Sequence, residues 1–187
     1  VGASSPRRAA ALGFVFATAW ICAGTWWMFV SMHRYGGLSA PLAALAVLAL
    51  AAFLALYLAA AMALVARWRP RSPARAAACF AAAWLLAELA RAVLLTGFPW
   101  VASGYAHVDS PLGGFAPWLG VYGIGALVAG LAARFGFADL RNAGGWIAPA
   151  SALAIALVAG ALLGRVDFST PTRTLTVSLL QGNVPQQ

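Results

Sequence analysis

Lysine is absent from this chain, and acidic groups are scarce. All twelve Lys or Arg positions among its 187 residues are arginine, and only four residues are Asp or Glu. The absence of lysine excludes lysine-based catalysis within this sequence. Charged residues make up 9% of the chain and hydrophobic residues 63%. A soluble domain of this size could not bury so much apolar surface, so the composition indicates that lipid surrounds much of the chain.

Cysteine is also scarce. Cys22 and Cys79 both lie in apolar stretches, where an unpaired cysteine behaves as a small hydrophobic side chain. We therefore expect neither a disulfide nor a nucleophile from them. The two cysteines and two histidines follow no zinc-binding spacing, and we expect no metal site and no cofactor.

Long apolar runs are abundant, and five of them dominate the sequence. Each is near or above the ~20 residues that a helix needs to cross the hydrocarbon core of a bilayer. They comprise residues 11–30, 41–66, 74–95, 116–133 and 146–164. The sequence therefore predicts an all-α membrane fold, a polytopic bundle of about five transmembrane helices over residues 1–165. Because the first residue is Val1 and not Met, we expect the chain to begin inside a longer protein.

The arginines alternate with these runs. They gather before the first run, between the second and third, and between the fourth and fifth, whereas the two remaining loops hold only Arg34. The gathered arginines are Arg7, Arg8, Arg67, Arg69, Arg71, Arg75, Arg134 and Arg141. By the positive-inside rule these ends face the cytoplasm, so the segment after Gly164 is predicted to emerge on the outer face. Topology thus accounts for the net charge of +8, and we expect a lipid bilayer and no nucleic acid as partner.

One apolar run carries charge well inside it. Glu88 and Arg91 are three residues apart, on one face of the expected helix. A charge at mid-membrane costs about 2.5–3.5 kcal/mol on insertion scales, which makes both residues functional candidates. A structural pair is an equal alternative, because Arg91 lies one turn from the outer end and could extend to the interface with Glu88 neutralising it.

The segment that follows, residues 95–117, is rich in glycine and proline and cannot be one continuous helix. It is also rich in aromatic residues: Phe98, Trp100, Tyr105 and Phe115. We interpret it as an ordered, partly re-entrant segment at the outer interface, with a simple aromatic-belt connector as the alternative. His107 and Asp109 could form an acid–base pair, but without a nucleophile nearby they are more typical of turn-forming and interfacial polar groups.

The character of the chain changes over residues 166–187. A short polar linker precedes residues 174–180, which are rich in β-forming side chains and partly alternate, and residues 181–185 then carry turn-forming types. This pattern predicts a β-strand. Because a single strand has no partner for its backbone groups, we expect it to be the first strand of a domain that continues beyond this sequence.

Several motifs together point to one family. In the membrane part they are Glu88-Leu-Ala-Arg91, Thr96-Gly-Phe-Pro-Trp100, Gly104-Tyr105, Asp109-Ser-Pro-Leu-Gly113 and Leu119-Gly-Val-Tyr122. Two earlier motifs are Gly24-Thr-Trp-Trp27 and Tyr35-Gly-Gly37, and a late one is Val177-Ser-Leu-Leu-Gln-Gly-Asn-Val-Pro-Gln186. In this order and at this spacing, the chain resembles the apolipoprotein N-acyltransferases. The late motif is similar to the opening strand of that family's nitrilase-like domain.

The resemblance implies a bacterial inner-membrane enzyme with a nitrilase-like αββα domain on the periplasmic side. Such an enzyme transfers an acyl chain from a phospholipid donor to the N-terminal cysteine amine of a diacylated apolipoprotein. The family uses a cysteine nucleophile, a glutamate base and a lysine, through a thioester. Neither these residues nor the two helices that begin the family's membrane domain have a counterpart in this sequence. We therefore expect a truncated nitrilase-like domain, no catalytic residue in this chain, and no activity from it alone.

The contribution expected of this chain is lipid access. Residues 95–117 would line the path of the acyl donor, and Glu88 would hold Arg91 against a phosphate or a loop carbonyl. The residues predicted for this site are Glu88, Arg91, Phe98, Pro99, Trp100 and Tyr105. Two other functions stay open from the residues alone: a fragment of a membrane transporter, or a non-catalytic membrane anchor for an amidase-like domain.

Overall fold

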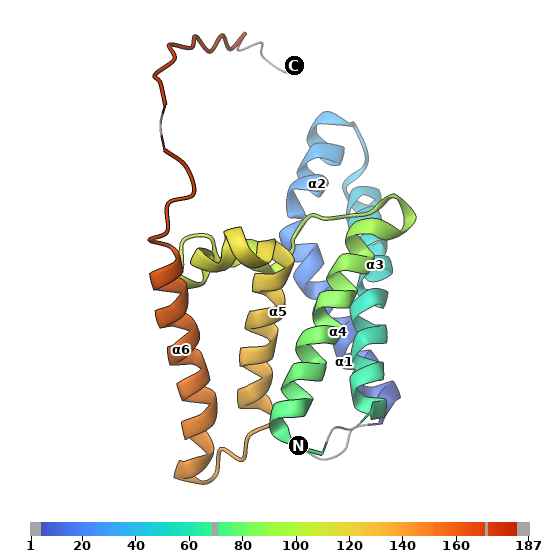
Figure 1. Ribbon diagram of the computed structural model, residues 1–187. Helices are drawn as coiled ribbons and strands as arrows, with labels where there is room; N and C mark the ends of the chain where they lie inside the picture. The colour runs from blue at the N-terminus through green and yellow to red at the C-terminus, as the bar shows by residue number, and fades with distance from the viewer. Residues whose placement is uncertain (1–4, 69–70, 171, 183–187) are drawn as a thin grey trace.

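The computed structural model describes residues 5–68, 71–170 and 172–182, which form a helical bundle (Figure 1). Its α-helices are α1 (Pro6–Gly24), α2 (Trp26–Val30), α3 (Ala40–Trp68), α4 (Pro73–Val93), α5 (Ala116–Gly136) and α6 (Ile147–Leu163). Short 3-10 or π-helical turns join several of them, and the described residues contain no strand. The predicted all-α class is confirmed for this part of the chain.

Most of these helices could cross a membrane. Four helical segments, which contain α3, α4, α5 and α6, are long and apolar enough to do so. The bent pair Pro6–Gly24 and Trp26–Tyr35 is a fifth candidate if the two helices count as one span. The structure therefore confirms a polytopic bundle with four to five candidate spans.

The first predicted span, residues 11–30, is not one straight helix. α1 ends at Gly24, and the next helical segment leaves it at an angle of 55°. Thr25 is fully buried at this bend, and its hydroxyl donates a hydrogen bond of 2.7 Å to the carbonyl oxygen of Ile21. A threonine that bonds one turn back in this way bends a helix, and hydropathy does not report such a bend.

Helices α1 and α4 begin with the same kind of N-cap. The hydroxyl of Ser5 accepts a hydrogen bond from the backbone N–H of Arg8, at 3.3 Å, and a proline follows the serine. Ser72 caps α4 through the N–H of Arg75, at 3.2 Å, again with a proline next. A serine cap followed by proline at the first helical position fixes a helix start. Both starts therefore place arginines in the first helical turn.

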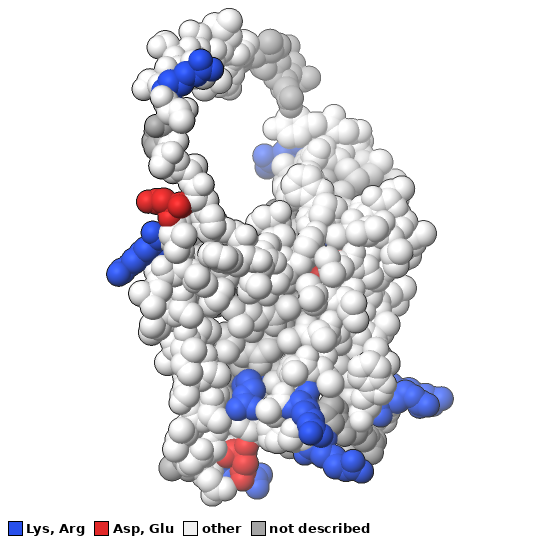
Figure 2. Space-filling view, in the orientation of Figure 1, with Lys and Arg blue, Asp and Glu red and all other residues white. Residues whose placement is uncertain are grey.

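The charged residues of the bundle are unevenly distributed. α1 and α4 begin at the end of the bundle where α3 and α5 finish (Figure 1). Basic side chains gather at this end, whereas the middle of the bundle shows almost none on the face drawn in Figure 2. The tail that follows α6 leaves from the opposite end (Figure 1). The arginine-rich loops therefore share one end of the structure, as their alternation in the sequence predicts.

Small residues bring the helices together. α1 packs along α3, α3 along α4, and α4 along α5. The core between them is built largely from alanines, among which Ala17, Ala51 and Ala55 are at most 1% exposed. Small side chains let membrane helices approach closely, which is the main source of packing energy where lipid surrounds the bundle. α6 is held chiefly by the turn Pro111–Phe115.

The structure shows no strand over residues 174–180, where the sequence predicts one, and the strand stays a prediction for a protein in which a pairing domain follows. These residues form no strand, and Leu179 and Leu180 are almost fully exposed. The physical reason is that no other described segment lies beside them to pair with their backbone groups. Residues 183–187, which include the end of the turn predicted over residues 181–185, lie outside the described residues. The proposed domain boundary at residue 165 stays a prediction.

Candidate functional site

The candidate site lies where α4 ends and the chain folds back over the end of the bundle. We call residues 94–103 the α4 loop. Three of its residues that are not glycine have a positive φ: Leu95 at 53°, Thr96 at 72° and Val101 at 60°. Such conformations cost about 1–3 kcal/mol each, so the surrounding structure must hold them in place.

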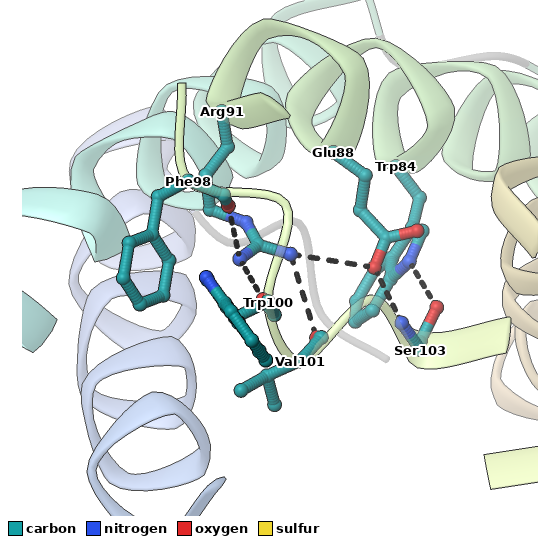
Figure 3. A network of polar contacts seen from close by, with 7 residues as sticks. All are labelled: Trp84, Glu88, Arg91, Phe98, Trp100, Val101 and Ser103. Atoms are coloured by element: carbon teal, nitrogen blue, oxygen red, sulfur yellow. Dashed lines mark hydrogen bonds and ion pairs between the residues drawn. The ribbon is translucent and has the colours of Figure 1, made fainter. Parts of the chain in front are cut away.

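Arg91 forms much of the hydrogen bonding that holds the α4 loop in this conformation. Its Nη1 atom donates hydrogen bonds to the carbonyl oxygens of Phe98, at 3.1 Å, and Trp100, at 2.6 Å (Figure 3). Its Nη2 atom donates to the carbonyl oxygen of Val101, at 3.4 Å. The backbone adds a further bond, because the N–H of Phe98 donates to the carbonyl oxygen of Arg91 at 2.8 Å. One guanidinium group thus binds three carbonyls of the α4 loop, while its side chain is only 4% exposed.

Glu88 holds the far end of the same loop. Its Oε1 atom accepts a hydrogen bond from the backbone N–H of Ser103, at 2.7 Å, and lies 3.9 Å from Nη2 of Arg91. The Oε2 atom is buried and has no hydrogen-bond partner among the described residues. Trp84, one turn earlier on α4, donates from Nε1 to the hydroxyl of Ser103 at 3.1 Å. Three side chains of one helix face therefore fix the middle and the far end of the α4 loop (Figure 3).

Helix α5 closes the site from the other side, and glycine makes this possible. A Cβ atom on Gly125 would overlap the hydroxyl of Ser103 and lie 2.7 Å from Oε2 of Glu88. A Cβ atom on Gly104 would overlap the carbonyl oxygen of Val121. At Gly104, directly after the loop, the chain packs backbone against backbone on α5, and at Gly125 the helix packs against side chains of the site, so neither position has room for a side chain.

The structure brings together only some of the predicted site residues. Glu88 and Arg91 join Phe98 and Trp100 in one network, but the last two take part through backbone carbonyls and not through their rings. The ring of Phe98 packs against the buried residues Ile21 of α1 and Ala51 and Leu54 of α3. The ring of Trp100 is 58% exposed, with its centroid 5.7 Å from that of Trp27 on α2.

Pro99 and Tyr105 are both exposed and stand outside the network. His107 contributes its backbone carbonyl, which accepts hydrogen bonds from the N–H of Ser110, at 3.1 Å, and from its hydroxyl, at 3.0 Å. His107 thus takes part in the turn that precedes Pro111 through its backbone, and Asp109 lies within that turn.

The sequence interpretation missed Trp84, Ser103 and Gly125. Trp84 could have been found, because it lies four and seven residues before Glu88 and Arg91 and so shares their helix face. Ser103 and Gly125 carry no such signal, since only the tertiary fold brings them to the carboxylate of Glu88.

The chemistry of this arrangement is that of a clamp. The guanidinium group of Arg91 and one carboxylate oxygen of Glu88 are occupied by backbone groups, and both side chains are buried. Charge-assisted hydrogen bonds of this kind contribute about 1.5–3 kcal/mol each, enough to offset the strained loop conformations. Within the described ranges, no three His, Cys, Asp or Glu side chains lie close enough to hold a metal ion.

Comparisons with known proteins agree with the motifs. Residues 1–134 match the family described as the apolipoprotein N-acyltransferase N-terminal domain. The apolipoprotein N-acyltransferase of Verminephrobacter eiseniae is 55% identical, over 96% of this chain and 35% of that protein. Those of Ralstonia nicotianae and Pseudomonas putida are 45% and 42% identical, over 96% and 97% of this chain and 35% and 37% of their own length.

This chain therefore spans about a third of the length of the curated relatives that it matches. The matched residues 1–134 include α1 to α4, the α4 loop that Arg91 and Glu88 hold in place, and nearly all of α5, whereas α6 lies beyond them. The resemblance seen in the sequence motifs is confirmed, and the chain belongs to the apolipoprotein N-acyltransferase family.

Proposed function

We propose that this chain is the membrane part of an enzyme that transfers an acyl chain from a phospholipid to the N-terminal cysteine amine of a diacylated apolipoprotein. Its family membership supports this activity and gives no support to the transporter alternative. The sequence contains no lysine, so the lysine of the family's catalytic set is not within it. The chain alone is accordingly expected to be inactive and to serve lipid access.

The orientation that we propose follows from charge. The arginine-rich end of the bundle faces the cytoplasm, and the α4 loop and the tail after α6 face the periplasm. Figure 1 supports this arrangement, because the loop and the tail lie at the end opposite to the starts of α1 and α4. The enzyme is then a multi-pass protein of the bacterial inner membrane, with a periplasmic site for acyl transfer.

The observation that carries the proposal is the clamped α4 loop. Arg91 and Glu88 hold its backbone, and several large apolar side chains nevertheless stay exposed on and beside it. Among them are Leu95, Trp100 and Tyr105, between 58% and 74% exposed. Aromatic rings favour the level of the lipid headgroups, where the acyl ester of a phospholipid lies.

In this proposal Trp100 and Tyr105 contact the acyl donor, and Phe98 anchors the loop in the bundle. Pro99 stiffens the turn between them, because its ring fixes φ. Arg91 and Glu88 act by position: their polar atoms hold the backbone of the loop and do not bind the phosphate.

The test is thioester formation from phospholipid in the full-length enzyme. At subsaturating phospholipid, Arg91→Ala and Trp100→Ala are expected to slow this step by at least about tenfold, the effect of losing roughly 1.4 kcal/mol of transition-state stabilisation relative to free enzyme and donor. Trp68→Ala is the matched control, because Trp68 is an equally exposed tryptophan at the last residue of α3, at the arginine-rich end. Normal rates in both variants at normal protein levels would refute a role in lipid access.

A further inference from the structure

The strained residue Val101 touches a second element besides α4. Its φ is 60°, and its carbonyl oxygen lies 3.4 Å from Nη2 of Arg91. Its side chain lies directly over Gly24, where a Cβ atom would be 2.5 Å from Cγ1 and 2.8 Å from Cγ2 of Val101. Val101 therefore connects the buried guanidinium group on α4 to the last residue of α1.

Gly24 marks the bend between α1 and α2. The helical segment Trp26–Tyr35 leaves α1 at 55° directly after it, and Thr25 is fully buried between the two helices. Three residues beyond Gly24, the ring of Trp27 lies 5.7 Å from that of Trp100. The α4 loop thus contacts the bent segment at two points, once at the bend and once on α2 itself.

We propose that Gly24 and Val101 are positioning residues that couple the tilt of α2 to the α4 loop. Arg91 holds the carbonyl of Val101, the isopropyl group of Val101 fills the space over Gly24, and α2 is kept at the angle that sets Trp27 beside Trp100. The surface formed by Trp27 and Trp100 then depends on Arg91, although neither ring makes a polar contact with its guanidinium group. Its use in donor binding rests on the proposed function, whereas the coupling itself is a property of the fold.

The coupling can be tested by whether one substitution, Gly24→Ala, stabilises the local structure or disturbs it. Replacing glycine by alanine within or at the end of a right-handed helix ordinarily stabilises it, because alanine loses less backbone entropy. At Gly24 the added methyl group would overlap Val101, a stiff β-branched side chain, so α2 or the loop must move. Val101→Ala removes the two overlapping methyl groups and should restore the fit.

The experiment is hydrogen exchange, followed by mass spectrometry, on the full-length enzyme in lipid nanodiscs. Gly24→Ala is expected to speed exchange at least about threefold in both Trp26–Tyr35 and the α4 loop. The double variant Gly24→Ala/Val101→Ala should return both segments to wild-type exchange. Gly136→Ala is the matched control, because a Cβ atom at this last residue of α5 would meet no atom of the described residues within 4 Å.

A second variant approaches the coupling from its other end. Arg91→Lys keeps the charge, but an ammonium group cannot span three carbonyls, so the α4 loop should loosen. The coupling predicts that exchange in Trp26–Tyr35 rises as well, although this segment is untouched by the substitution. Faster exchange confined to the α4 loop in Arg91→Lys, or a Gly24→Ala effect that Val101→Ala does not reverse, would overturn the proposal.

Kinetics on the same variants separate this inference from the proposed function. Gly24→Ala is expected to raise the KM for the phospholipid donor more than it lowers kcat, and the double variant should restore the KM. If exchange is coupled but the donor KM stays at the wild-type value, lipid access by this surface is refuted and the coupling stands. If exchange is uncoupled, the coupling fails whatever the donor KM.

Discussion

The Nη1 atom of Arg91 lies 2.6 Å from the carbonyl oxygen of Trp100. A positive charge inside a membrane bundle is therefore used to hold the chain's own backbone. The desolvation free energy of placing this charge among apolar helices is offset by hydrogen bonds to three carbonyl oxygens and by the carboxylate of Glu88, 3.9 Å away. The resulting loop keeps backbone conformations that would be unfavourable without the clamp.

Removing the guanidinium group is predicted to destabilise the enzyme strongly. Arg91→Ala leaves the carboxylate of Glu88 buried without its charge partner and three loop carbonyls without their donor, at an expected loss of about 3–5 kcal/mol. Arg91→Lys should lose less, because the charge is retained. Thermal or denaturant unfolding of the full-length enzyme in detergent checks this order, and equal stability of Arg91→Ala and wild type would contradict it.

The pair should also behave as a unit in a double-mutant cycle. Glu88→Leu and Arg91→Leu each leave one buried charge behind, whereas the double variant leaves none. The loss in the double variant is therefore expected to be smaller than the sum of the single losses, by about 0.5–3 kcal/mol. The four unfolding free energies give this coupling directly, and strictly additive losses would show that the two groups do not interact.

The contact between α5 and the loop is predicted to tolerate no side chain. Gly125→Ala would push a methyl group into the hydroxyl of Ser103 and towards Oε2 of Glu88, at an expected cost of about 1–3 kcal/mol from overpacking. Gly136→Ala, on the same helix, has open space and should be neutral or slightly stabilising. The unfolding curves of Gly125→Ala and Gly136→Ala are compared. Equal stability of the two variants would show that α5 does not pack tightly against the site.

Much of the fold could be predicted because hydropathy and helix length are strong signals in a membrane chain. The predicted spans over residues 41–66 and 146–164 differ by two residues or fewer at each end from the helices Ala40–Trp68 and Ile147–Leu163. The bend at Thr25 was missed, since a single back-bonding hydroxyl does not alter an apolar run. The strand over residues 174–180 was predicted from local pattern, and a strand also needs a neighbour, which pattern does not supply.

The candidate site was predictable only where its residues are unusual for their surroundings. Glu88 and Arg91 stand out as charges in an apolar run, and both belong to the clamp. The roles of Phe98 and Trp100 could not be predicted, because any residue can offer a backbone carbonyl. Ser103 likewise contributes its backbone N–H. This group does not depend on the residue type, so the sequence does not reveal its role.

The proposed orientation predicts which loops are accessible from outside the cell membrane. Thr174→Cys, in the tail after α6, should react with a membrane-impermeant maleimide in intact spheroplasts. Ala138→Cys, between α5 and α6 at the arginine-rich end, should react only after the membrane is opened. Labelling is measured against the unsubstituted protein, and the reverse pattern would place the α4 loop in the cytoplasm.

In the proposed function the clamped α4 loop presents Trp100 to the acyl donor, and single-turnover acylation of the full-length enzyme is the experiment that decides this. Trp100→Ala is expected to slow acylation about tenfold when the phospholipid is subsaturating. At saturating phospholipid this variant should recover most of the wild-type rate, because the ring supports donor binding. Trp68→Ala should follow the wild type at both concentrations. A Trp100→Ala enzyme that matches Trp68→Ala at subsaturating donor would show that the ring of Trp100 does not serve donor binding.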